Sequence, residues 1–287
     1  MAELFGFLNI NKPVGMTSHD VVSAMRRITK IKQIGHTGTL DPFAQGVLPV
    51  CIGKSTRLIE YLEDDKEYLA TVQFGQNTDT YDIEGTVTET FDKKITKDEL
   101  LSALIDFEGN ILQYPPKYSA IKVGGKKLYE YARNNQEVEI KPRNVYISKI
   151  ELKSFDDETQ QAQILIGCSK GTYIRSIAFD LGKNLSCGGH LVKLIRTKAG
   201  KFNIETSVNL DDLKTVTDVE KSLINPLSVL NYPQYKLNEF EYKKIINGNS
   251  IKDENIKDYN VVILVYSDKI KSVAYSHDGI ISVRKVL

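Results

Sequence analysis

One short loop carries the residues best suited to chemistry. The segment from Gly35 to Pro42 reads GHTGTLDP. Its glycines let the backbone approach a ligand closely, and Pro42 restricts the orientation of Asp41. A carboxylate held at such a bend can act as a covalent nucleophile toward a sugar carbon. The structural alternative is that Asp followed by Pro simply opens a short helix.

Two other side chains have both a functional and a structural interpretation. Tyr68 shares the inward face of an alternating segment, so it is either a core tyrosine or a ring that stacks on a base. Arg175 falls in the first turn of an apolar helix, where the helix dipole disfavours a cation. It therefore needs a partner anion, such as the Asp41 carboxylate or a phosphate, unless it is an ordinary surface arginine.

The sequence lacks the common signatures of metal, nucleotide and serine chemistry. It contains no GxSxG elbow, P-loop, HExxH pair or dinucleotide-binding glycine fingerprint, and its four histidines are scattered. We therefore predict chemistry without a cofactor and without a metal. The three cysteines form no CxxC pair, which favours free thiols in a reducing compartment: Cys51, Cys168 and Cys187.

Basic and aromatic residues are interleaved between Tyr114 and Arg143. This segment suits single-stranded RNA, because bases stack on aromatic rings and phosphates attract cations. The alternative is a solvated charged surface, with Gly124-Gly125 at a hairpin tip. A second acid-poor stretch, from His190 to Lys201, adds further basic residues. The cations singled out here are Lys126, Lys127, Arg133, Lys193, Arg196 and Lys198.

The elements that must position these residues predict an α+β fold. Strands are expected at 5–10, 47–52, 68–74, 145–152 and 161–168, and helices at 18–28, 55–62, 97–106 and 173–185. Thr17 and Asp20 match a capping box. Three further strand-like runs follow residue 258. This order favours a mixed, mainly antiparallel sheet with flanking helices, plus a small, mostly β C-terminal domain.

Length and charge set the remaining limits. The chain has 287 residues, with 38 Lys plus Arg and 37 Asp plus Glu. This balance excludes a polycation that binds phosphate over its whole surface, but it allows one basic face and one acidic face. The length suggests one large domain and one small one. The sequence shows no pattern typical of a secretory signal or of a membrane-spanning segment, so we expect a cytoplasmic protein.

Six blocks of sequence stand in order over residues 5 to 200: NINKPVGMTSHDVV, GHTGTLDPFAQGVLPV, DKEYLATVQFGQNTDTYDIEG, PPKYSAIKVGGKKLYEYAR, CSKGTYIRSIAFDLG and CGGHLVKLIR. Together they resemble bacterial tRNA pseudouridine-55 synthases, the TruB family. The resemblance implies isomerisation of one uridine in the T loop of tRNA, without cofactor or metal, by base flipping and an aspartate nucleophile that attacks either the sugar or the base.

The resemblance also implies roles for single residues. Asp41 matches the catalytic aspartate, and Arg175 matches the arginine that pairs with it. Tyr68 is expected to stack on the base, Leu194 to close the pocket, and His36 to fill the vacated stack. The last implied site residue is Tyr173, while Lys12-Pro13 matches a motif that braces the Asp41 loop.

The implied organisation is a catalytic domain over 1–232 and a PUA-like RNA-binding domain over 233–287. Within the first, the segment at about 114–143 is expected to close over the tRNA T stem-loop, with Lys126, Lys127 and Arg133 binding it. We expect a monomer with no obligate protein partner. Two other functions stay open: an RNA-binding folding helper, and a glycoside or nucleoside hydrolase, which normally needs a second carboxyl group.

Overall fold

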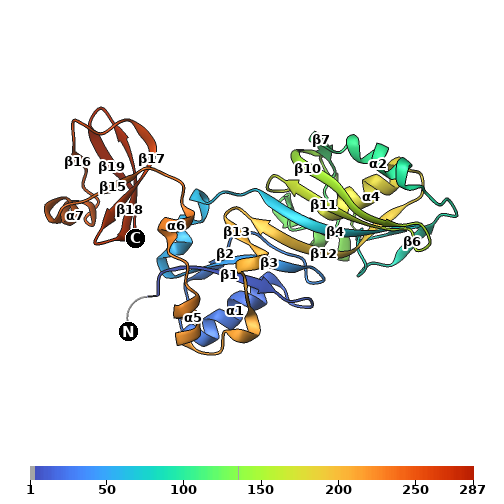
Figure 1. Ribbon diagram of the computed structural model, residues 1–287, viewed down its shortest axis with the longest axis horizontal. Helices are drawn as coiled ribbons and strands as arrows, with labels where there is room; N and C mark the ends of the chain where they lie inside the picture. The colour runs from blue at the N-terminus through green and yellow to red at the C-terminus, as the bar shows by residue number, and fades with distance from the viewer. Residues whose placement is uncertain (1–3, 135) are drawn as a thin grey trace.

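The computed structural model describes residues 4–134 and 136–287, which form two large β-sheets with helices packed against them and two small two-stranded sheets (Figure 1). The larger sheet has ten strands in the order β14-β1-β3-β12-β4-β11-β10-β7, with β2 paired to β3 and β13 to β12. Among the described strand pairs of this sheet, only β1–β14 and β12–β3 are parallel. The predicted α+β class with a mixed, mainly antiparallel sheet is confirmed.

The strands of this sheet are β1 (Gly6–Lys12), β2 (Ile34–His36), β3 (Gln45–Ile52), β4 (Lys66–Phe74), β7 (Gly109–Gln113), β10 (Arg143–Asp156), β11 (Gln161–Cys168), β12 (Gly189–Ala199), β13 (Phe202–Asn203) and β14 (Val208–Asn209). The helices beside it are α1 (Ser18–Thr29), α2 (Lys97–Ile105), α4 (Ile174–Asn184), α5 (Val216–Ser222) and α6 (Pro226–Val229), with short 3₁₀ segments η1 (Gly53–Tyr61), η2 (Ile204–Thr206) and η3 (Leu210–Asp212).

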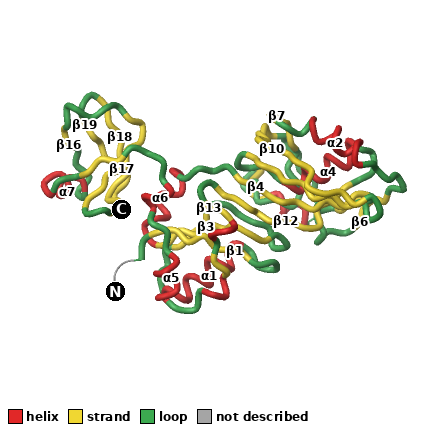
Figure 2. The backbone as a smooth tube through the Cα atoms, in the orientation of Figure 1, coloured by secondary structure: helices red, strands yellow, loops and turns green. Residues whose placement is uncertain are grey.

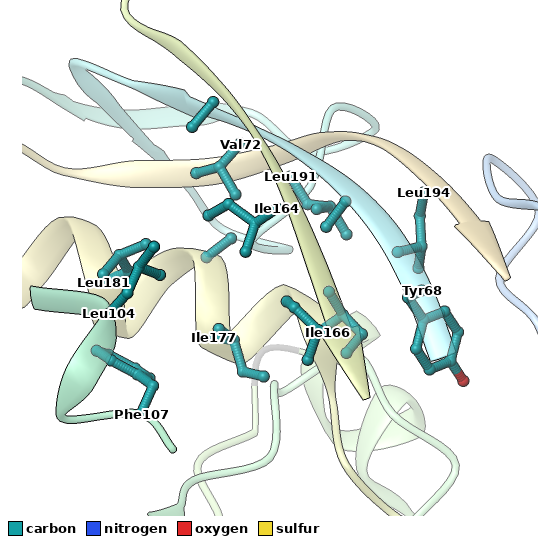
Figure 3. Close-up of a cluster of buried hydrophobic side chains, with 14 of the residues drawn as sticks. Tyr68, Val72, Leu104, Phe107, Ile164, Ile166, Ile177, Leu181, Leu191 and Leu194 are labelled. Atoms are coloured by element: carbon teal, nitrogen blue, oxygen red, sulfur yellow. The ribbon is translucent and has the colours of Figure 1, made fainter. Parts of the chain in front are cut away.

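The core that supports the site lies between β4, β11, β12 and helices α2 and α4. Along β4 every second residue is buried, from Tyr68 to Phe74, as the alternation predicts. These side chains meet the apolar stripe of α4, which includes Ile177 and Leu181 (Figure 3). Tyr68 and Leu194 lie at one end of this cluster, so the packing that folds the domain also positions the pocket residues.

The other half of the sheet is covered by α1 and α5. The predicted capping box is present, because Thr17 accepts a hydrogen bond from the Asp20 backbone while the Asp20 carboxylate accepts one from Thr17. The helix expected at 55–62 is wrong in type, because residues 55–61 belong to the 3₁₀ segment η1, which ends before Leu62. Its Ser55 hydroxyl is turned inward and donates to the carbonyls of Gly6 and Ile52.

The C-terminal sheet has the order β15-β17-β18-β19-β16 and forms a separate lobe (Figure 2). Its elements are β15 (Gln234–Lys236), α7 (Glu239–Ile245), β16 (Ile251–Lys252), β17 (Tyr259–Tyr266), β18 (Lys269–His277) and β19 (Ile280–Val286). Val265 and Val273 of this sheet pack in one apolar cluster with Phe7 of β1 and Tyr61 of η1. The expected mostly β C-terminal unit is present, and the boundary at residue 232 stays a prediction.

Two small hairpins project from the large sheet. One joins β5 (Gln76–Thr78) to β6 (Val87–Thr90). The other joins β8 (Lys122–Val123) to β9 (Lys126–Lys127) and continues into α3 (Leu128–Arg133). Gly124 and Gly125 form its tip with positive φ angles, as expected. Among the described helices, none is both long and apolar enough to cross a membrane.

Candidate active site

Asp41 lies in the loop between β2 and β3. The short helix considered for this position is wrong, because Asp41 to Ala44 form a turn closed by a 3.1 Å hydrogen bond from the Ala44 amide to the Asp41 carbonyl. Next to it, the Ser18 hydroxyl accepts from the Leu40 amide and donates to the Leu40 carbonyl, which ties the loop to α1. The Asp41 side chain stays 34 % exposed, so it is held by its backbone yet open to a ligand.

Arg196 stabilises the same loop through hydrogen bonds to its backbone carbonyls. Its side chain is fully buried and donates to the carbonyls of Gly38, Thr39 and Val47. The sequence pattern places Arg196 in a basic stretch facing RNA, and that interpretation is wrong. Two other cations of the stretch are paired with acids of the neighbouring segment, Lys198 with Asp65 at 3.5 Å and Lys201 with Glu63 at 3.3 Å.

Lys12 supports the loop from the other side. Its buried ammonium donates to the carbonyls of Pro13, Met16 and Pro42. Burial is the main reason that the pKa of Lys12 falls to about 8, and the negative charge of Asp41 opposes that fall. The geometry therefore agrees with the expected bracing role, because one hydrogen bond reaches the residue directly after Asp41.

Arg175 enters the site from the first turn of α4 and joins three separate segments. Its guanidinium forms ion pairs with Asp41 at 3.0 Å and Asp82 at 3.2 Å. It also donates to the carbonyls of Thr80, at 3.2 Å, and Tyr118, at 3.0 Å. With only 7 % of its side chain exposed, it is not the surface arginine considered as an alternative. Two carboxylates compensate for its unfavourable place at a helix N-terminus.

Asp82 is the functional candidate that sequence reasoning missed. Its side chain is 4 % exposed, and burial is the main reason that the pKa of this carboxyl group is raised. It accepts a 2.6 Å hydrogen bond from Thr80 and one from the Glu84 amide, so its orientation is fixed. The sequence feature that could have indicated Asp82 is its place in the block NTDTYDIEG, where several acids and threonines follow a strand.

A cavity of about 460 Å³ opens above Asp41 and brings most of the predicted residues together. Tyr68 lines it as a nearly buried ring beside Leu194 (Figure 3), and the pKa of the Tyr68 phenol is raised chiefly by burial. Tyr68 is therefore a core residue that also forms part of the cavity wall, and stacking of its ring on a base stays a prediction. The predicted residues that line the cavity are Asp41, Tyr68, Tyr173, Arg175 and Leu194.

Tyr173 caps the start of α4 and is fixed through its backbone. The buried Gln113 side chain accepts from the Tyr173 amide at 2.8 Å and donates to its carbonyl at 3.0 Å. This pair of bonds couples the edge strand β7 to the helix end that carries Arg175. Burial raises the pKa of the Tyr173 phenol, which therefore stays protonated near neutral pH.

His36 and the basic residues of the hairpin lie outside the cavity lining. His36 is half-buried at the end of β2, and its pKa is lowered mainly by burial. Lys127 and Arg133 each lie 5.3 Å from the ring centroid of Tyr129, which does line the cavity. Lys126 is exposed at the hairpin. None of these predicted residues therefore lines the cavity, and Lys127 and Arg133 are connected to it through Tyr129.

The arrangement favours a nucleophile over a pair of acid and base carboxyl groups. Asp41 faces the cavity beside a fixed cation, whereas Asp82 is buried and does not line the cavity. A hydrolase needs a second carboxyl group that reaches the substrate. Among the described residues, one group has spacing suited to a metal, Asp258, His277 and Asp278, and all three are exposed on the C-terminal lobe.

Comparison with known proteins gives two family models that match this chain. The first, TruB family pseudouridylate synthase (N terminal domain), matches residues 26–174, and the second, tRNA pseudouridylate synthase B C-terminal domain, matches residues 175–230. Residues 231–287 lie beyond both matches. The boundary between the two models falls directly before Arg175, so the candidate site draws on both.

Curated relatives match nearly the whole chain. A tRNA pseudouridine synthase B of Clostridium kluyveri is 40 % identical over 279 residues, covering 95 % of this chain and 96 % of the relative. One from Caldanaerobacter subterraneus is 45 % identical over 259 residues, covering 89 % and 88 %. Among solved structures, a Cbf5-Nop10-Gar1 complex contains a chain with a TM-score of 0.73 and 26 % identity, covering 98 % of this chain and 84 % of that one.

Proposed function

The chain belongs to the TruB family of pseudouridylate synthases and isomerises uridine to pseudouridine in tRNA, and we propose that Asp41 is the nucleophile and that the target is uridine 55 of the T loop. The observation that carries the assignment is the Asp41 carboxylate, partly exposed at a cavity and ion-paired to the buried Arg175. The fixed cation orients the carboxylate at the cavity, where it can attack a bound nucleotide.

The reaction exchanges one bond to the sugar for another. The bond between C1′ and N1 of uracil breaks, the base turns, and C1′ bonds to C5, which loses its proton while N1 gains one. Atoms and electrons balance within the nucleotide, so the isomerisation consumes no co-reactant. Asp41 acts either on C1′ or on the base.

Access to the base requires that it leave the RNA stack, at a cost of a few kcal/mol. Tyr68 and Leu194 supply two walls for the flipped base, one aromatic and one aliphatic, and Tyr173 a third. His36, at the end of β2, fills the place that the base vacates. Burial keeps the His36 ring largely neutral, which suits insertion between bases.

The RNA contacts extend beyond the cavity. Lys126, Lys127 and Arg133 bind phosphates as the segment at about 114–143 closes over the T stem-loop, and Tyr129 joins that surface to the cavity. The C-terminal domain, residues 233–287, binds RNA next to the catalytic domain of residues 1–232. The enzyme acts in the cytoplasm as a monomer, without an obligate protein partner.

Mass spectrometry of a T stem-loop RNA incubated with pure protein, in buffer containing a metal chelator, tests this function. The expected result is one pseudouridine at position 55 with no free uracil. Release of free uracil would identify a hydrolase instead. Binding without any modified base would leave only the RNA-binding helper.

A further inference from the structure

Tyr81 lies between the two groups that hold Arg175 from one side. The residue before it, Thr80, offers its carbonyl to the guanidinium, and the residue after it, Asp82, offers its carboxylate, both at 3.2 Å. The conformation of Tyr81 therefore sets the separation and direction of two of the ligands of Arg175. Tyr81 does not line the 460 Å³ cavity, so it acts on the chemistry only through its neighbours.

The backbone of Tyr81 adopts a left-handed conformation, with φ of 64°. A bulky non-glycine residue rarely takes this conformation, and it persists only where the surroundings fix it. Two backbone hydrogen bonds do so here: the Tyr81 carbonyl accepts from Leu191 of β12 at 3.0 Å, and its amide donates to Thr78 at 3.3 Å. The turn places Asp82 beside Leu191 in an isolated parallel bridge.

The Tyr81 ring is stacked on Phe179, with centroids 4.0 Å apart and planes inclined by 18°. Phe179 and Arg175 are four residues apart on α4, so they lie on the same side of the helix. The stack thus joins the 80–82 turn to the same helix face that carries the guanidinium. Helix and turn are held together twice, once through the aromatic rings and once through Arg175.

We infer that Tyr81 is a positioning residue for the isomerisation: its stack on Phe179 holds the Thr80 carbonyl and the Asp82 carboxylate where they orient Arg175 toward Asp41. This inference rests on the proposed role of Asp41. An offset by about 1 Å in such an arrangement can cost about a hundredfold in rate without weakening substrate binding. Loss of the stack should therefore reduce the rate of the bound complex rather than the affinity for tRNA.

The test is the single-turnover rate at saturating enzyme, measured together with the dissociation constant for tRNA and the melting temperature. Tyr81→Ala removes the ring, and Tyr81→Gly removes it while also easing the left-handed backbone. Both should lower the rate by at least about tenfold with affinity within about twofold of wild type. Tyr81→Phe, which keeps the stack, should restore the rate.

Two further variants separate positioning from general stability. Phe179→Leu should lower the rate like Tyr81→Ala, and the double variant should be no slower than the slower single variant, because both remove one interaction. Phe202→Ala breaks an edge-to-face contact with Phe7, whose ring centroid lies 5.9 Å away, and neither ring lines the cavity; it should lower the melting temperature but leave the single-turnover rate unchanged.

Wild-type single-turnover rates in Tyr81→Ala and Tyr81→Gly would overturn the inference, as would a rate loss that Tyr81→Phe shares. Asp41→Asn, measured in parallel, keeps the two proposals apart. If Asp41→Asn is inactive while Tyr81→Ala is fully active, only the positioning role fails. If Asp41→Asn is itself active, the proposed nucleophile fails first.

Discussion

Asp41 and Asp82 are joined through one cation, because the Arg175 guanidinium lies 3.0 Å from the first carboxylate and 3.2 Å from the second. The two acids differ sharply in exposure, 34 % against 4 %. One carboxylate therefore faces the cavity while the other stays behind the arginine. This division agrees with the proposed nucleophilic role of Asp41, and it suits Asp82 to orienting the cation.

Arg175→Lys is expected to lower the rate of pseudouridine formation by about a hundredfold while tRNA affinity is retained. The planar guanidinium of Arg175 contacts two carboxylates and two carbonyls, whereas a lysine presents one point charge and cannot contact all four in the same geometry. Asp82→Asn keeps the shape of the side chain but removes one charge, and should lower the rate of pseudouridine formation about tenfold. The two rates are measured on a T stem-loop RNA at saturating enzyme. Full activity of Arg175→Lys would show that the ion pair has no part in catalysis.

The sequence was sufficient for those parts of the site that depend on local pattern. The alternation ending in Tyr68 and the apolar stripe behind Arg175 both follow from strand and helix periodicity, and both are confirmed. Asp82 was missed because its partner is supplied by a distant helix, which no local pattern reveals. Arg196 was misassigned for a similar reason: its neighbours in the chain include lysines, but the fold turns its side chain inward toward three carbonyls.

Arg196→Lys should lower the free energy of unfolding by about 2 kcal/mol, because buried carbonyls of the Asp41 loop lose their donors. The rate of pseudouridine formation should fall with it, since the loop is less rigidly held. Urea unfolding monitored by circular dichroism gives the first quantity. Lys193→Ala, at an exposed position of the same strand, is the matched control and should unfold like wild type. Equal stability of both variants would contradict the bracing role of Arg196.

Replacing Lys126, Lys127 and Arg133 together by alanine should weaken tRNA binding and reduce its salt dependence. For every RNA phosphate that the variant no longer neutralises, the slope of log K against log salt should become shallower by about 0.7 to 0.9. Filter binding at several salt concentrations measures the slope. Lys97→Ala, on the exposed surface of α2, should change it little. An unchanged slope in the triple variant would remove the hairpin from the RNA-binding surface.

Asp180 supplies a test that is independent of RNA. Burial raises the pKa of this carboxyl group to about 6, so the folded protein holds the proton more tightly than the unfolded chain does. The resulting stabilisation is complete below the ordinary pKa of 3.8 and is lost as the pH rises through about 6.

Asp180→Asn should therefore raise the melting temperature at pH 7.5, where the wild-type carboxylate is ionised, and leave it nearly unchanged at pH 3.5. The free energy of unfolding at pH 7.5 should rise by about 1 kcal/mol, a modest gain because the Asp180 carboxylate keeps part of its contact with water. Thermal unfolding at both pH values measures the difference. A gain of the same size at both values would show that ionisation of Asp180 is not its cause.

The nucleophile is the central claim, and Asp41→Asn tests it most directly because the substitution keeps the size and removes the charge. Pseudouridine in a T stem-loop RNA is quantified by mass spectrometry after prolonged incubation with each protein at equal concentration, alongside the dissociation constant for the RNA. No detectable pseudouridine is expected from Asp41→Asn, with RNA affinity close to that of the wild type. Pseudouridine formed by the variant at the wild-type rate would contradict the proposed role of Asp41 as the nucleophile.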